Sequence, residues 1–161
     1  MNSLILPKEI KERLKEEYER SGISEEELIL EALSGYLKQP LDPESKAEMH
    51  SALSEKYMRE AREFLNKGDY AQASEKAWGA ASQMVKKIAI KRGRELRSHG
   101  ELHKFVSNLS KEKDGEIMNL WFSAISLHQN FSENWLPKEA VRSAIENVRR
   151  FIEKLRSGYH G

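Results

Sequence analysis

Start and stop signals for helices recur along the whole chain, and they constrain its fold more than any other feature. Three segments have the pattern of a capping box, in which a serine or aspartate and a glutamate or glutamine three positions on exchange hydrogen bonds at a helix start. The three pairs are Ser24 with Glu27, Asp69 with Gln72, and Ser98 with Glu101. Between these signals, apolar residues recur at intervals of three and four, the period of a helix with one buried face. No segment longer than "SLIL" is a plausible strand, so an all-α fold is expected.

The segment "QPLDPES", residues 39–45, divides the chain into two units. Residues 1–40 should form a helix-turn-helix extension, and their six basic and nine acidic residues favour docking or dimerisation over DNA binding. Residues 41–158 contain about five longer helical patterns, and the tight turn at "KGDY" should make its two flanking helices antiparallel. The sequence therefore predicts an antiparallel bundle of about five helices with a small N-terminal helical extension.

Composition and motifs argue against several classes of protein. The chain has no cysteine, which excludes disulfides, thiol nucleophiles and cysteine metal sites and fits a reducing cytoplasm. We find no apolar run long enough for a membrane span, and "MNSLILPKE" lacks the regions of a signal peptide. There is also no phosphate loop, dinucleotide fingerprint or HExxH motif. We therefore expect a cytoplasmic protein with no membrane partner, and we predict neither a cofactor nor a metal site.

The densest group of charges is basic and lies at the end of a predicted helix. Between residues 86 and 97 six cations face one acidic residue, Glu95. The cations are Lys86, Lys87, Lys91, Arg92, Arg94 and Arg97. Such a group would attract phosphates and steer nucleic acid. The alternative is that the cations stabilise the carboxyl end of a helix and cover apolar neighbours with their stems.

His99 is the first candidate catalytic residue, because it follows the predicted cap Ser98 and should begin a helix. The positive helix end and the nearby arginines disfavour imidazolium, so a neutral ring could act as a base. With Arg94 as a phosphate clamp, these groups would suffice for RNA transesterification. The alternative is a surface histidine at a helix start. His103 lies one turn further on, but no third metal ligand is obviously placed beside the two histidines.

Two further segments contain candidate binding residues. In "LHQNF", His128 lies on the apolar face of its helix, where a histidine is usually a satisfied core residue, but Asn130 beside it favours a pocket. In "SEKAWGA", Glu75 fits an exposed position and Trp78 a core position. The small residues around them favour a packing surface.

The segments "LDPES", "GDYAQASEKAWGAASQMVKKIAIKRG", "SHGEL" and "LHQNFSENWL" resemble, in order and spacing, the archaeal PaREP family (PaREP-one and PaREP-eight) over roughly residues 24–155. That family is placed in the HEPN superfamily of helical domains. The resemblance implies a helical bundle, often a homodimer, with nucleotide or nucleic acid as the usual partner class. It also keeps Glu75, Trp78 and His128 together as candidates for one lined cleft.

Ribonucleases of that superfamily use an arginine followed, after four to six residues, by a histidine. Arg94 and Arg92 both have this spacing to His99. However, the motif usually lies on a late helix, which corresponds better to "WFSAISLHQN" at residues 121–130. His128 is present there but the upstream arginine is absent, and this departure counts against nuclease activity.

Three functional hypotheses follow, and whether the chain is an enzyme stays open among them. The first is a homodimeric module that binds nucleotide or RNA through residues 86–97, as part of a toxin/antitoxin-like or nucleotidyltransferase-partner system. The second is a metal-independent endoribonuclease in which His99 is the general base or acid and Arg94 stabilises the pentacoordinate phosphate. The third is a protein-interaction scaffold without a ligand.

Overall fold

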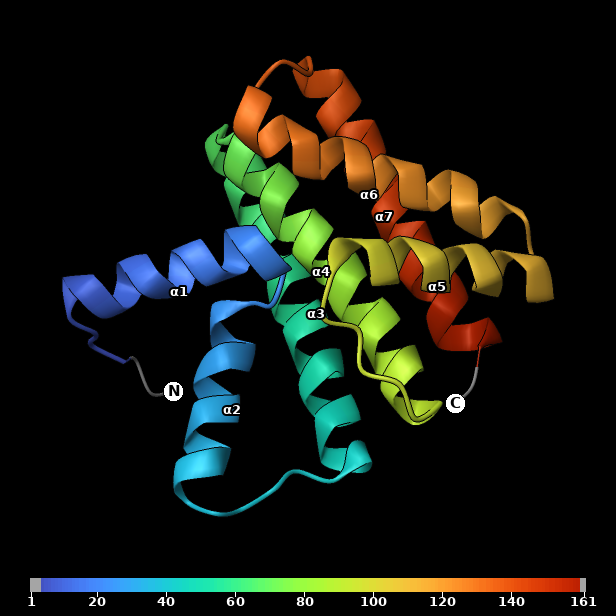
Figure 1. The fold of residues 1–161 in the computed structure, drawn as a ribbon. Helices are drawn as coiled ribbons and strands as arrows, with labels where there is room; N and C mark the ends of the chain where they lie inside the picture. The colour runs from blue at the N-terminus through green and yellow to red at the C-terminus, as the bar shows by residue number, and fades with distance from the viewer. Residues whose placement is uncertain (1–3, 160–161) are drawn as a thin grey trace.

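The computed structural model describes residues 4–159, and over this range the chain forms seven helices and no strand (Figure 1). The helices are α1 (Lys8–Ser21), α2 (Glu25–Tyr36), α3 (Pro43–Lys67), α4 (Tyr70–Lys91), α5 (His99–Glu112), α6 (Glu116–Glu133) and α7 (Lys138–Gly158). The all-α prediction is confirmed. Of the "SLIL" segment, Ser3 lies outside the described residues and the rest is not a strand. Among the described helices, none is both long and apolar enough to span a membrane.

The predicted caps are where the helices begin, but only one is a complete capping box. At α2, the Ser24 hydroxyl accepts from the backbone of Glu27, and the Glu27 carboxylate accepts from the backbone N–H of Ser24 at 2.8 Å. Ser98 caps α5 in the same way, but the carboxylate of Glu101 accepts from the backbone of Arg97 instead. Asp69 caps α4 through its own side chain. The prediction of three reciprocal boxes is therefore wrong for the helices that begin after Asp69 and Ser98; at the latter, the Glu101 carboxylate accepts from a different backbone N–H.

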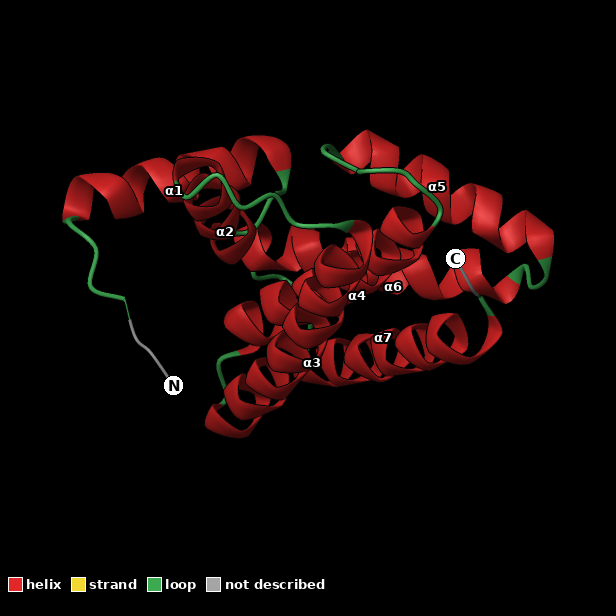
Figure 2. Ribbon diagram, turned by 90° about the horizontal axis from the view of Figure 1, so that it is seen from below, coloured by secondary structure: helices red, strands yellow, loops and turns green. Residues whose placement is uncertain are grey.

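Helix α4 lies at the centre of the molecule and packs against α3, α5, α6 and α7 (Figure 2). Its alanines at positions 73, 77, 80 and 81 are fully buried, which lets the neighbouring helices approach closely. A side chain at Gly79 would place its Cβ 3.2 Å from the Tyr57 ring of α3, so the glycine allows this close packing. Large core residues such as Trp121 and Phe151 fill the remaining space, and burying each stabilises the fold by roughly 2 kcal/mol or more.

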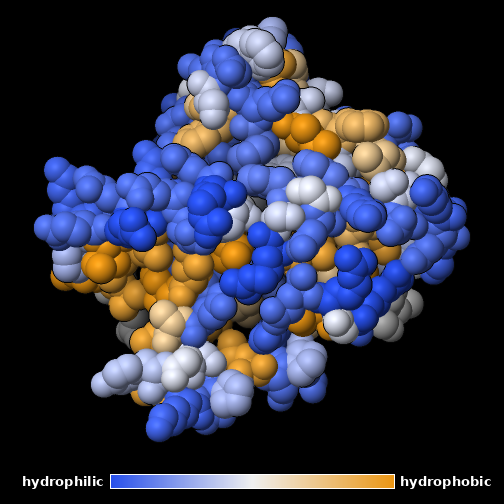
Figure 3. Space-filling model, in the orientation of Figure 1, coloured by the Kyte–Doolittle hydropathy of each residue, from blue (hydrophilic) through white to orange (hydrophobic). Residues whose placement is uncertain are grey.

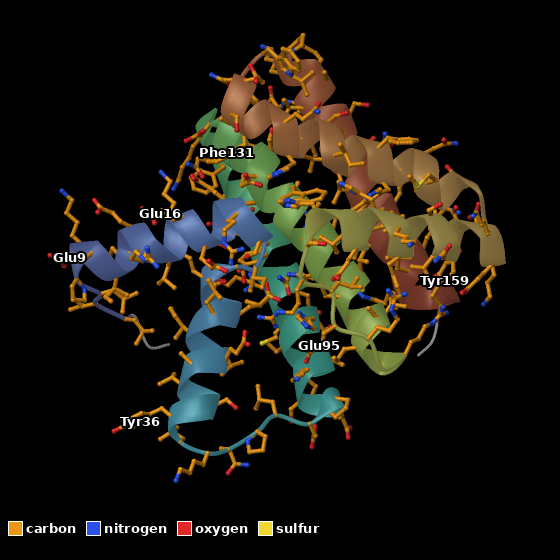
Figure 4. All side chains as sticks on the ribbon, viewed as in Figure 1. Glu9, Glu16, Tyr36, Glu95, Phe131 and Tyr159 are labelled. Atoms are coloured by element: carbon orange, nitrogen blue, oxygen red, sulfur yellow. The ribbon has the colours of Figure 1, made fainter. Side chains whose placement is uncertain are left out.

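Helices α1 and α2 diverge from the turn at Gly22 and lie outside the bundle (Figure 1). Their apolar side chains are only partly covered. Leu33, Tyr36 and Leu37 are 49%, 85% and 66% exposed. Apolar residues gather along α2 and below α1 in Figure 3, and Figure 4 shows Tyr36 pointing away from the molecule. The amphipathic pattern therefore predicted the helix correctly, but not a partner for its apolar face.

Candidate functional site

A cluster of aromatic and titratable side chains lies where α4, α5 and α6 converge beside the C-terminal end of α1 (Figure 1). Its centre is Trp78, which is 2% exposed. The His128 ring stacks on Trp78 with 4.7 Å between ring centroids, and the His99 ring lies 5.9 Å from it. We call the group the histidine cluster: Glu75, Trp78, His99, His103, Trp121 and His128. The structure thus brings Glu75, Trp78 and His128 together, as the resemblance implied.

Glu75 and His128 form a hydrogen-bonded pair within this cluster. Nδ1 of His128 lies 2.9 Å from Oε1 of Glu75, and the hydroxyl of Tyr18 donates to the same oxygen at 3.0 Å. Because a carboxylate only accepts, Nδ1 carries the proton and Nε2 is left as the reactive nitrogen of a neutral ring. The His128 side chain is 35% exposed and the Glu75 side chain 12%. A shielded carboxylate therefore orients a histidine that solvent can reach.

Burial and the neighbouring carboxylate also act on Tyr18. Burial, followed by the charge of Glu75 and the hydrogen bond to it, raises the pKa of the Tyr18 hydroxyl. The phenol therefore stays protonated and donates to Glu75 throughout the neutral range. Tyr18 was not among the predicted site residues. Its position on the apolar stripe of α1 indicated an inward orientation, but no local signal pointed to a partner on α4.

His99 lies next to His128, with 5.2 Å between the ring centroids. Burial lowers the pKa of His99, and the positive charge that His128 and His103 carry when protonated lowers it further. Nε2 of His99 is buried and has no hydrogen-bond partner. It lies under the turn at Gly22, where an added Cβ would be only 2.8 Å away. An unpaired buried nitrogen is rare in folded proteins and needs an explanation.

His103 has a structural partner. Its Nδ1 accepts a hydrogen bond of 3.0 Å from Nε1 of the fully buried Trp121. Burial lowers the pKa of His103, as does the charge of His128. Among residues 4–159, no three histidine, aspartate or glutamate side chains are arranged to hold a metal ion. The chemistry that the cluster offers is therefore that of two adjacent histidines, one of them oriented by a carboxylate.

The predicted catalytic pair of Arg94 and His99 is not assembled in this structure. The Arg94 guanidinium lies over the ring of Phe105, 5.4 Å from its centroid, whereas His99 faces Trp78 and Gly22. The backbone N–H of Arg94 closes the end of α4 by donating to the carbonyl of Ala89. The chain then runs as an extended segment to Ser98 and separates the two side chains, although they are close in sequence.

Carboxylates from other helices neutralise half of the predicted basic segment. Lys86 is buried and lies 3.0 Å from Glu27, Arg92 lies 2.6 Å from Glu112, and Arg97 lies 3.3 Å from Glu31. The local excess of positive charge in the sequence is therefore largely offset in the fold. The remaining cations, Lys87, Lys91 and Arg94, make no ion pair with any described residue.

The side chain of Asn130 is occupied by structural hydrogen bonds. Its amide donates to Ser74 at 3.0 Å, and its oxygen accepts from the backbones of Trp135 and Leu136 at 2.9 and 2.8 Å. The residue is completely buried and holds the chain as it leaves α6. These contacts favour a structural role over the predicted binding role.

The sequence reasoning missed a second buried polar group between α2, α3 and α4. His50 donates to Gln83 at 2.7 Å, Gln83 donates to Glu27 at 2.9 Å, and Lys86 completes the network. Burial lowers the pKa of His50 despite the neighbouring Glu27. The network borders a cavity of about 230 Å³. A lone histidine on an apolar stripe gives no local indication of such partners.

Comparisons with known proteins place the chain in a family. A solved crystal structure of a protein from Sulfolobus solfataricus matches with a TM-score of 0.59 and 33% sequence identity, covering 65% of this chain and 93% of that one. None of the curated proteins matches. The sequence model of the archaeal PaREP1/PaREP8 family matches residues 49–152, a range that includes α4, α5, α6 and therefore the whole histidine cluster. Because this match spans more than half of the chain, the protein belongs to the archaeal PaREP1/PaREP8 family.

Proposed function

We propose that the protein is a HEPN-like module whose histidine cluster performs metal-independent acid–base chemistry on the phosphodiester backbone of RNA. The observation that carries the proposal is the Glu75–His128 hydrogen bond beside the unpaired Nε2 of His99. Two neighbouring histidines in different environments can act as general base and general acid, one accepting a proton while the other donates one.

In the reaction, neutral His99 takes the proton of the ribose 2′-hydroxyl, and the 2′-oxygen attacks phosphorus. The bond from phosphorus to the 5′-oxygen breaks as protonated His128 donates its proton to that oxygen. The products are a 2′,3′-cyclic phosphate and a 5′-hydroxyl, so atoms and charge balance. Glu75 orients the His128 ring through the hydrogen bond to Nδ1, and the lowered pKa of His99 keeps that second ring neutral.

Access to His99 depends on the N-terminal unit. Nε2 is covered by the turn at Gly22, so substrate reaches it only when that turn moves. The cluster also lacks an arginine, since Arg94 lies over Phe105. Stabilisation of the pentacoordinate phosphate would therefore have to come from a second subunit of the expected homodimer or from another protein partner.

The second candidate function is binding of nucleotide or RNA without cleavage. The absence of an arginine from the histidine cluster favours it, because transfer of a phosphoryl group without a cation nearby is slow. The cations of the predicted segment that make no ion pair, among them Lys87 and Lys91, would then contact phosphates.

The deciding experiment incubates end-labelled RNA with the protein in EDTA and follows both cleavage and the gel shift. We expect His128→Ala to reduce cleavage by about 10²- to 10⁴-fold while the shift remains. His103→Gln is the matched control, because glutamine still accepts from Trp121 and His103 neither takes nor donates a proton in the proposed reaction. Equal cleavage by the wild type and His128→Ala would rule out the ribonuclease, and a shift without any cleavage would support the binding module.

Homodimerisation is a separate proposal, and it is supported by the resemblance. Sedimentation equilibrium of the full chain over a range of concentrations tests it, since a stable dimer has twice the mass of the 161-residue protomer.

A further inference from the structure

Helices α3 and α7 lie on the other side of α4 from α1 and α5 (Figure 2). Residues of these two helices line a second concave surface. This groove has a volume of about 300 Å³. Met58 and Ile152 are buried and form part of its floor. Its charged lining consists of four arginines and two glutamates: Arg59, Arg62 and Glu55 from α3, and Arg149, Arg156 and Glu153 from α7. None of these residues belongs to the histidine cluster.

Three of the four arginines form no ion pair with a described residue, although the charge of Arg62 contributes, after Arg149 and Arg150, to the lowered pKa of Glu146. Arg149 forms ion pairs of 2.6 Å with both Glu146 and Glu153. Arg59, Arg62 and Arg156 make neither an ion pair nor a hydrogen bond with any residue in the range 4–159. Lys87 of α4 lies near this groove, since the charge of Arg156 contributes, after burial and the charge of Lys91, to a lowered pKa of its ammonium.

This arrangement differs from that of three arginines elsewhere on the protein. Arg92, Arg97 and Arg150 all have a carboxylate within 3.3 Å, in a chain whose acidic and basic residues are almost equal in number. Like charges three residues apart on one helix, such as Arg59 and Arg62, repel each other. A concave surface that gathers unpaired guanidinium groups therefore gains stability from an external anion.

We propose that the groove between α3 and α7 binds the phosphate groups of a polyanionic chain. Guanidinium groups bind phosphate through paired hydrogen bonds, and a phosphate has oxygens enough for more than one arginine. The arginines without an ion pair lie on both sides of the groove, with Arg59 and Arg62 on α3 and Arg156 on α7. The groove therefore engages more than one phosphate, which a nucleic-acid strand or an inorganic polyphosphate supplies.

The test measures fluorescence anisotropy of labelled single-stranded RNA, with unlabelled polyphosphate as competitor, in EDTA at several salt concentrations. The variant replaces Arg59, Arg62 and Arg156 with glutamine. It should bind RNA at least about tenfold more weakly, and its slope of log Kd against log salt should fall by about 2, since each phosphate contact to a single strand contributes about 0.7.

The matched control removes three other exposed arginines, by Arg13→Gln, Arg20→Gln and Arg150→Gln, which gives the same net charge. It should stay within about twofold of the wild type. Equal weakening in both triple variants, no change in the groove variant, or no binding of either polyanion to the wild type would each overturn the proposal. Competition by polyphosphate at equal phosphate concentration identifies phosphate alone as the determinant, and failure to compete identifies the nucleic-acid strand.

The His128→Ala variant separates this proposal from the ribonuclease, because it lacks the acid–base pair and retains the groove. It should bind RNA like the wild type. Whether His128→Ala cleaves RNA therefore does not bear on the groove proposal. Weaker RNA binding by the variant of Arg59, Arg62 and Arg156 likewise does not depend on whether the protein cleaves RNA.

Discussion

Glu27 and Glu75 are helical glutamates whose carboxylates are mostly shielded from water, with side chains 10% and 12% exposed. Glu27 neutralises the buried ammonium of Lys86, whereas Glu75 accepts from His128 and Tyr18. The same side chain thus serves stability in one position and orients a histidine in the other. What distinguishes the two is whether the partner is a permanent cation or a ring that can exchange a proton.

Glu27→Gln should destabilise the protein by about 3 kcal/mol, because it leaves the ammonium of Lys86 buried without a counter-charge. The control is Glu31→Gln on the same helix. Its partner Arg97 is half exposed, so we expect a change below about 1 kcal/mol. Urea unfolding monitored by circular dichroism measures both. Equal effects would contradict the buried-pair account.

The same substitution should change how stability depends on pH. Burial raises the pKa of Glu27, but Lys86 and the backbone N–H of Ser24 outweigh it and hold that pKa below its usual 4.5. The unfolded chain therefore takes up the proton first as the pH falls. The contribution of this group is fully present above pH 4.5 and is lost as the pH falls through the lower folded value. In the Glu27→Gln variant, the free energy of unfolding should therefore fall less steeply as the pH is lowered through this range.

At the scale of elements, a glycine that ends a helix can serve its own turn alone or can also allow contact with a distant helix. Gly22 and Gly68 both end helices with positive φ, at 75° and 78°. Gly68 has nothing within 4 Å of an added Cβ, whereas Gly22 faces the ring of His99. One glycine therefore serves only its own turn, and the other also fits α1 and α2 against the histidine cluster.

Gly22→Ala should destabilise the protein more than Gly68→Ala. Both substitutions force alanine into the left-handed region, at about 1–2 kcal/mol, but only Gly22→Ala also presses on His99, which should add about 1 kcal/mol. Thermal and urea unfolding give the two values. In a His99→Ala background the difference between the two substitutions should disappear, and its persistence would show that His99 is not its cause.

At the scale of the whole molecule, α1 and α2 are attached to the bundle mainly by polar side chains. The connections include the Tyr18–Glu75 and Tyr57–Glu26 hydrogen bonds and the Glu27–Lys86 pair. The bundle itself is held by a continuous apolar core that extends from α3 to α7. Removing residues 1–40 would leave Lys86 buried without Glu27, so point variants test the role of this unit better than truncation does.

Amide hydrogen exchange should therefore show two levels of protection. We expect α1 and α2 to exchange well before α4, because opening them breaks a few polar contacts and exposes little of the core. Mass spectrometry of the exchanging full chain resolves the two regions by peptide. Equal protection of α2 and α4 would show that the N-terminal unit unfolds only together with the bundle.

Local sequence signals set where the helices begin and end, because a cap or a stop acts on backbone groups within four residues. Ser24, Asp69 and Ser98 are caps in the structure, and the glycines after α1 and α3 end those helices. The sequence also sets which apolar faces turn inward along α4 and α7, since the helical period fixes them.

Which polar side chains meet depends on how the helices pack against one another. Glu27 and Lys86 are 59 positions apart, and Tyr18 and Glu75 are 57 apart, so both pairs depend on how α1 and α2 rest on α4. Arg94 and His99 are five positions apart and yet face different neighbours, because the extended turn after Gly93 directs them differently. Helices form through local hydrogen bonds. A site also requires side chains from different helices to come together, and this depends on how the helices pack across the whole chain.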